Sequence, residues 1–177
     1  MRVDLEAACE LLKDEIGNLY PIFQKIIELE KYTLLEPPYR NEYKIKHFER
    51  AQQELNFKFV KDYYRFLVIC DGGQLFLHTF YSIYNPDDEN SDIVEVNNYL
   101  HETEAIPDDA VAIGETNYGA YFVQKKSGRK GFGLWEPTEG YIADYDDFND
   151  LLVDIVNEAE YLLEEDSLFE YEDDDDE

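Results

Sequence analysis

The all-helical spacing of apolar residues in this chain of 177 residues stops at the segment Asp71-Gly72-Gly73. Before this segment, apolar side chains recur every three or four residues, which predicts helices. After it, aromatic and β-branched residues are frequent, which favours strands. Because the helices come first and no strand–helix units alternate, we expect an α+β fold rather than a parallel α/β fold.

The helical part is predicted to contain four segments. A break at Gly17-Asn18 makes the first two either separate helices or one broken helix. The fourth is expected to end at Gly72-Gly73, where glycine can adopt the left-handed cap conformation. The predicted helices are Leu5 to Ile16, Ile22 to Leu29, Tyr43 to Asn56 and Val60 to Cys70.

The remaining chain is predicted to form a mostly antiparallel sheet and two further helices. The last helix, Phe148 to Leu163, has a broad apolar stripe and is expected to be capped by Asp144 or Asp146. Residues 164–177 contain ten acids and no base, and we expect a disordered tail there. Strands are expected at residues 74–84, 110–114, 118–124, 132–136 and 140–143, with a short helix at 93–100.

Negative charge is concentrated in the second part of the chain. Residues 1–65 carry 12 acids and 11 bases, whereas residues 66–177 carry 30 acids and 4 bases. This imbalance either serves solubility or forms a docking surface for a basic partner, and it argues against binding nucleic acid. The four bases all lie at residues 125–130, which we interpret as a solvated hairpin turn or a small contact for an anion.

Sequence motifs for catalysis are absent, so we expect no enzymatic activity, metal or cofactor. The three histidines, His47, His78 and His101, lie outside recognisable catalytic motifs and are expected to be surface or packing residues. No zinc-type Cys or His spacing occurs. The single tryptophan, Trp135, is expected either in the core, which we favour, or at the rim of the sheet.

Two cysteines, Cys9 and Cys70, lie in apolar surroundings and are predicted to be buried, reduced thiols. The N-terminal residues lack the basic start and apolar stretch of an export signal, and no apolar run is long enough to span a bilayer. We therefore expect a cytoplasmic protein.

Three segments, in this order, resemble the SUKH superfamily, which includes fungal cell-wall regulators of the Smi and Knr type and many bacterial immunity proteins. They are ELNFKFVKDYYRFLVICDGG (residues 54–73), AIPDDAVAIGETNYGAYFV (105–123), and GFGLWEP with IADYDDFNDLLVDIV (131–156). The resemblance covers about residues 43–160. It implies one α+β domain at residues 43–163 with a curved sheet backed by helices. Residues 1–42 have no clear counterpart in the family, and from their apolar spacing we expect a helical extension there. It also implies no catalytic residues and binding through a variable surface.

The leading hypothesis is a bacterial immunity protein that binds a cognate toxin and blocks it sterically and electrostatically. We expect the toxin to have a basic nuclease domain. A regulatory or scaffold protein of the cell-wall-regulator type is the alternative, and an acidic hydrolase ranks third. Aromatic anchors inside an acidic rim are expected at the interface. The candidate contact residues are Asp87, Asp88, Glu89, Asp92, Trp135, Glu136, Glu139, Tyr141 and Asp144.

Overall fold

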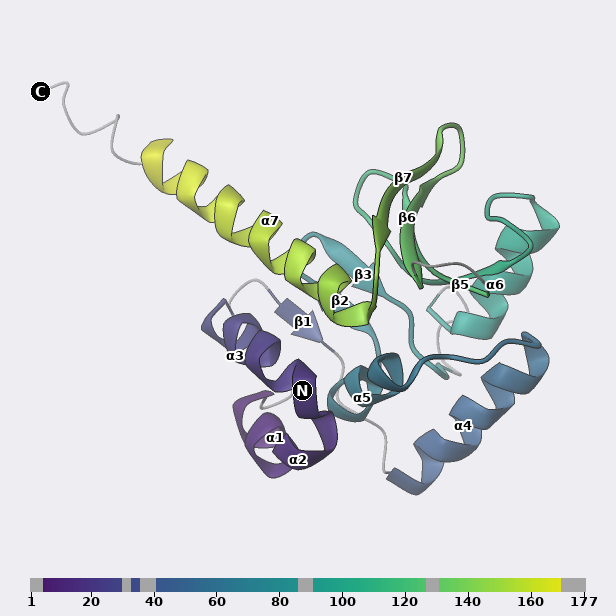
Figure 1. The fold of residues 1–177 in the computed structure, drawn as a ribbon, viewed down its shortest axis with the longest axis horizontal. Coiled ribbons are helices and arrows are strands. Elements are labelled where there is room, and N and C mark those ends of the chain that lie inside the picture. The colour runs from purple at the N-terminus through teal and green to yellow at the C-terminus, as the bar shows by residue number, and fades with distance from the viewer. Residues whose placement is uncertain (1–4, 30–32, 36–40, 86–90, 127–130, 170–177) are drawn as a thin grey trace, which may run out of the picture.

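The protein is described by a computed structural model at residues 5–29, 33–35, 41–85, 91–126 and 131–169. Helices and strands follow the predicted order, and the fold is α+β (Figure 1). The first helices are α1 (Leu5–Leu11), α2 (Lys13–Ile16), the 3-10 helix Gly17–Leu19 and α3 (Tyr20–Glu28). The predicted break is therefore confirmed, and Gly17, with φ of +55°, turns the chain there.

Four further helices follow, with bounds close to the prediction. They are α4 (Asn41–Glu54), α5 (Lys61–Ile69), α6 (Ile93–Glu102) and α7 (Phe148–Phe169). The predicted glycine cap of α5 was wrong, because α5 ends at Cys70 in an extended conformation. Gly72 is required for another reason. Its φ of +80° favours glycine, and a Cβ atom there would lie only 2.7 Å from the backbone nitrogen of Ser82.

Within the described residues, seven antiparallel strands form one sheet in the order in which they occur along the chain, from β1 at one edge to β7 at the other. The segment predicted as a strand or hairpin at residues 74–84 is a hairpin of two short strands that meet at Phe76-Leu77. Strand β1 lies in the N-terminal extension and was not predicted. The strands are β1 (Thr33–Leu35), β2 (Gly73–Leu75), β3 (His78–Phe80), β4 (Ala110–Glu115), β5 (Tyr121–Lys125), β6 (Phe132–Glu136) and β7 (Gly140–Tyr145).

Helices cover both faces of the sheet. On one face, Phe148 at the start of α7 packs against Phe132 of β6, Phe80 of β3 and Phe66 of α5, with ring centroids 5.4 to 6.4 Å apart. On the other face, the buried Asn97 side chain of α6 bonds both the backbone nitrogen and the carbonyl of Ala112, at 2.7 and 2.8 Å. Strand β3 pairs only with Gly114 and Glu115 of β4, so Asn97 satisfies backbone groups of Ala112 that the β3–β4 ladder leaves open.

The N-terminal helices belong to the same hydrophobic core as the sheet, which answers a question that the sequence left open. Phe23 of α3 is fully buried and stacks on Phe66 of α5 with ring centroids 5.9 Å apart. Lys25 of α3 pairs with Glu160 of α7 at 3.4 Å. Cys9 and Cys70 are buried and form no disulfide, as predicted. None of the helices in the described part of the chain combines the length and the apolar character that crossing a membrane requires.

The start and the end of α7 both differ from the prediction. Neither Asp144 nor Asp146 caps the helix, because the side chain of Asp147, directly before Phe148, accepts a hydrogen bond from the backbone nitrogen of Asp150 at 2.9 Å. At the other end, the helix continues past Glu164 to Phe169. Residues 170–177 of the predicted acidic tail lie outside the described residues.

Candidate partner-binding face

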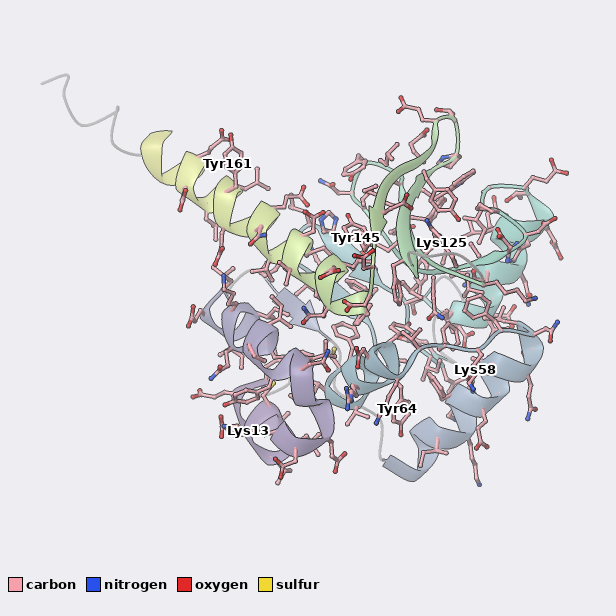
Figure 2. The ribbon with its side chains drawn as sticks, viewed as in Figure 1. Lys13, Lys58, Tyr64, Lys125, Tyr145 and Tyr161 are labelled. Carbon is pink, nitrogen blue, oxygen red and sulfur yellow. The ribbon has the colours of Figure 1, made fainter. Side chains whose placement is uncertain are left out.

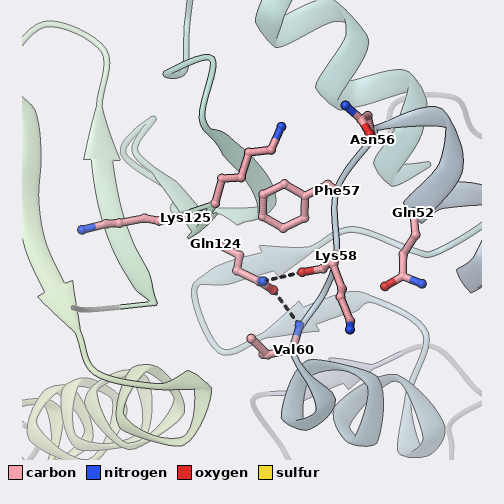
Figure 3. Close-up of a pocket in the computed structure, with 8 residues that line it drawn as sticks. Gln52, Asn56, Phe57, Lys58, Val60, Gln124 and Lys125 are labelled. Carbon is pink, nitrogen blue, oxygen red and sulfur yellow. Dashed lines mark hydrogen bonds between the residues drawn. The ribbon is translucent and has the colours of Figure 1, made fainter. Parts of the chain in front are cut away.

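A hollow in the described surface lies between the α4–α5 link and the end of β5 and has a volume of about 600 Å³ (Figure 3). Gln124, which is 3% exposed, holds its floor by donating to the carbonyl of Lys58 and accepting from the backbone nitrogen of Val60. Its described lining consists of amide, lysine and apolar side chains: Gln52, Asn56, Phe57, Lys58, Val60, Gln124, Lys125 and Lys126. The Lys125 side chain points away from it, toward β6 and β7. This lining provides hydrogen-bond donors but no nucleophile paired with a base.

The acidic loop that we expected to contact a partner is only partly described. Asp87, Asp88 and Glu89 lie outside the described residues. Asp92 was wrongly expected to be a surface contact, since it is 3% exposed and caps α6. Its carboxylate accepts hydrogen bonds from the backbone nitrogen of Val94 at 2.9 Å and from Arg50 at 3.2 Å. The carboxylate is therefore engaged within the fold.

Trp135 and Tyr141 form the centre of an aromatic surface at the β7 edge of the sheet. They are cross-strand partners, and their rings meet edge to face with centroids 4.9 Å apart. Tyr121 is the cross-strand partner of Trp135 on the other side and therefore points to the same face. Burial raises the pKa of the Tyr121 phenol, and nearby Glu115 and Tyr99 raise it further. Tyr99 belongs to α6 and is 64% exposed. We call Tyr99, Tyr121, Trp135 and Tyr141 the aromatic face.

Trp135 is neither fully in the core nor freely projecting. Its ring is partly buried and packs against the core, and its Nε1 donates to the carbonyl of Ala105 at 2.8 Å. This bond fixes the indole against the loop that follows α6. Tyr141 remains 39% exposed beside it. The pair therefore offers rigid aromatic area whose orientation is set before any partner arrives.

Lys125, Asp144 and Gly133 complete this part of the face. The Nζ of Lys125 lies 4.0 Å from the centroid of the Tyr141 ring and donates to the carboxylate of Asp144. Gly133 makes the arrangement possible, because a Cβ there would lie 2.8 Å from the Tyr141 ring and 3.0 Å from Cε of Lys125. Lys125 and Tyr145 lie on opposite sides of the β6–β7 hairpin, and Tyr145 bonds Asp154 of α7 (Figure 2).

Carboxylates surround the aromatic face. Burial raises the pKa of the Tyr141 phenol, and the charges of Asp109 and Asp144 raise it further. Glu136 accepts from the hydroxyl of Thr138 and from the backbone nitrogens of Thr138 and Glu139, and these bonds lower its pKa. Glu139 at the hairpin tip is exposed. Of the nine candidate residues, the structure places Trp135, Tyr141 and Asp144 on this face, whereas Glu136 and Glu139 lie at the adjoining turn between β6 and β7.

The histidines are engaged in packing, as expected. His47 stacks on Tyr84 with ring centroids 4.0 Å apart. His78 is buried, and its Nε2 lies 2.9 Å from the carboxylate of Glu158 on α7. His101 is partly buried near the end of α6. Among the described residues, no group of three His, Cys, Asp or Glu side chains is arranged to hold a metal ion.

Sequence reasoning did not identify Tyr99, Tyr121, Lys125 or Gly133 as parts of this face. For Gly133 and Tyr121 the sequence contained a signal. Residues two apart in a strand point to the same face, and Gly133 lies two residues before Trp135 in β6. Tyr99 comes from a helix whose position on the sheet no local pattern reveals. Lys125 was grouped with the basic turn, of which residues 127–130 lie outside the described residues.

Comparison with known proteins assigns most of the chain to a family. The model of the SMI1 / KNR4 family (SUKH-1) matches residues 44–154, which is more than half of the chain and includes α5, α6 and strands β2 to β7. No curated protein matches the chain. The matched range contains all four residues of the aromatic face as well as Lys125 and Asp144.

Proposed function

Because the chain belongs to the SMI1 / KNR4 family (SUKH-1), we propose that it works by binding another protein, as an immunity protein that neutralises a cognate toxin in the cytoplasm. The proposed toxin has a basic nuclease domain. Inhibition is steric and electrostatic, and it requires no chemistry by this chain.

The observation that supports this proposal best is the aromatic face inside its acidic surroundings. Protein interfaces derive most of their binding energy from a few tryptophan, tyrosine and arginine residues that lose contact with water. Trp135 and Tyr141 are held in contact before binding, so little conformational entropy is lost when a partner covers them. Exposed carboxylates at Glu139 and Asp144 are suited to steer a basic surface onto this centre.

The overall charge supports a basic partner. A nuclease must present a positive cleft to phosphates. A surface from a segment with 30 acids and 4 bases can occupy or shield such a cleft. Steering of this kind acts mainly on the association rate, so affinity should fall as salt rises.

The test begins with affinity capture from native-host lysate by the full chain, with washes at low and high salt and identification by mass spectrometry. We expect one dominant protein with a basic domain, released more readily at high salt, whose toxicity is suppressed by co-expression of this chain. Tyr141→Ala should weaken binding about tenfold or more. Tyr161→Ala is the matched control, because Tyr161 is 59% exposed but lies on α7, away from the aromatic face.

The alternative is a regulatory or scaffold protein of the cell-wall-regulator type, which the match to the SMI1 / KNR4 family also supports. Capture would then yield several weakly bound partners of ordinary charge. Co-expression would protect against none of them, and Tyr141→Ala and Tyr161→Ala would behave alike. That combination of results would overturn the immunity proposal.

A further inference from the structure

Lys125 occupies a position on the aromatic face that is built for a cation. Its Nζ lies 4.0 Å from the centroid of the Tyr141 ring and donates to the Asp144 carboxylate. The Lys125 side chain is only 13% exposed, whereas Asp144 is 46% exposed and accessible from solvent. An aromatic ring and a carboxylate around one ammonium group constitute a cation-binding site.

The two groups of this site face solvent on the surface where we place the partner. Tyr141 is 39% exposed and contacts Trp135 along its ring edge. Gly133, without a side chain, leaves room for the Tyr141 ring and for the Lys125 methylene chain on the same strand. The site therefore depends on backbone geometry of β6 and does not require Lys125 itself to form its walls.

A lysine at this position is unexpected from charge alone. The segment from residue 66 onward has 30 acids and 4 bases, and one of those four is folded back onto the face that should attract a basic partner. Ion pairs that water can reach contribute little to stability, and the Asp144 carboxylate of this pair is 46% exposed. The stability that the ion pair with Asp144 contributes is therefore too small to explain a positive charge at this position.

We propose that Lys125 is a built-in competitor, and that the site formed by Tyr141 and Asp144 takes an arginine side chain of the partner, which displaces Lys125. Arginine is favoured because its planar guanidinium group can stack on the tyrosine ring while forming two parallel hydrogen bonds to the carboxylate. The inference rests on the proposed function and adds the chemistry of the partner's anchor residue. Lys125 then sets a minimum affinity for the partner's cation, because a cation that cannot displace the Lys125 ammonium group does not bind.

The test uses Nα-acetyl-arginine methylamide, a probe with a single positive charge and no charged termini. Binding to the full chain is followed by NMR at the indole N–H of Trp135, the only tryptophan in the protein, whose ring contacts Tyr141. Lys125→Met keeps an unbranched apolar side chain and removes the ammonium group. Lys126→Met is the matched control, because it removes the same charge from the next residue, which is exposed.

We expect Lys125→Met to bind the probe about three- to tenfold more tightly than Lys126→Met, since one cation–π contact is removed as a competitor. Tyr141→Leu or Asp144→Asn, combined with Lys125→Met, should abolish that gain, and Tyr141→Phe should retain it. The corresponding lysine derivative should bind more weakly than the arginine probe.

Equal affinities of Lys125→Met and Lys126→Met would show that general electrostatics explains binding and would overturn the inference. So would a probe that leaves the Trp135 signal unchanged in both the native chain and Lys125→Met. These outcomes leave the proposed function open to its own capture and protection test. Conversely, a tightened site in a chain that protects against no toxin would overturn the immunity proposal and leave the arginine site standing.

Discussion

Asp92 illustrates how a single carboxylate can be required by the fold although its sequence context suggests a surface role. It lies at the end of an acidic, polar loop, yet it is 3% exposed. Its oxygens accept from the backbone nitrogens of Val94 at the start of α6 and of Asn85 on the opposite side of the loop. Arg50 of α4 donates to the same carboxylate at 3.2 Å. One side chain thus connects a helix start, a loop and a second helix.

Replacing Asp92 with Ala should lower the free energy of unfolding by about 2 to 4 kcal/mol, because the change removes a helix cap and leaves Arg50 partly buried without this partner. Urea denaturation followed by circular dichroism measures the difference. Glu95→Gln, an exposed position in the first turn of α6, is the control and should change stability by less than about 0.5 kcal/mol. A loss of similar size in both variants would contradict the assigned role of Asp92.

Whole elements show how far local sequence determines structure. The helices and strands β4 to β7 were predictable, because their apolar residues repeat with the period of the element and turns separate them. Strand β1 was not, since it has only three residues, Thr33–Leu35, and owes its existence to pairing with Gly73–Leu75 far along the chain. The cap of α7 was misassigned to Asp144 or Asp146, because three aspartates, Asp144, Asp146 and Asp147, precede the helix and only the backbone path selects Asp147.

The candidate site was predictable to a similar degree. Trp135, Tyr141 and Asp144 were found because they are aromatic or acidic residues near a strand end. Their contact depends on the register between β6 and β7, which includes an irregularity after Leu134 that no local pattern announces. The part played by Gly133 likewise appears only once Tyr141 is seen to lie across it.

The N-terminal helices should be indispensable for folding. Phe23 is 0% exposed and packs on Phe66, so Phe23→Ala is expected to cost about 3 to 5 kcal/mol of stability. Gln24→Ala, at the exposed neighbouring position, should have little effect.

A chain that begins after β1 should lose cooperative thermal unfolding in calorimetry. A truncated chain with a sharp transition like that of the full protein would show instead that residues 1–35 are an accessory.

At the scale of the whole molecule, burial of ionisable but uncharged groups makes stability sensitive to alkaline pH. Burial raises the pKa of Cys9 to about 12, with a smaller contribution from Glu10. It also raises the pKa of the Tyr63 and Tyr81 phenols above their ordinary value. These groups stay protonated in the folded chain at pH values where the unfolded chain releases its protons.

The unfolding free energy should therefore be highest below about pH 8.5 and fall as pH rises toward 10.5, because the unfolded state binds fewer protons there. Denaturant unfolding at pH 7, 9 and 10.5 measures the slope, and absorbance of tyrosinate should rise together with unfolding. In Tyr81→Phe, which keeps the ring and removes the hydroxyl that bonds Glu115, the fall should be shallower. An unfolding free energy that is the same at all three pH values would contradict this account.

The sequential strand order has a consequence for how binding specificity can diversify. Every residue of the aromatic face, together with Lys125 and Asp144, lies between Tyr99 and Asp144, in one unbroken stretch of the chain. The N-terminal helices precede that stretch and α7 follows it. Two crossovers between related genes, one on each side of this stretch, would therefore exchange the whole of the proposed partner-binding face and leave both flanking parts of the scaffold in their original genetic background.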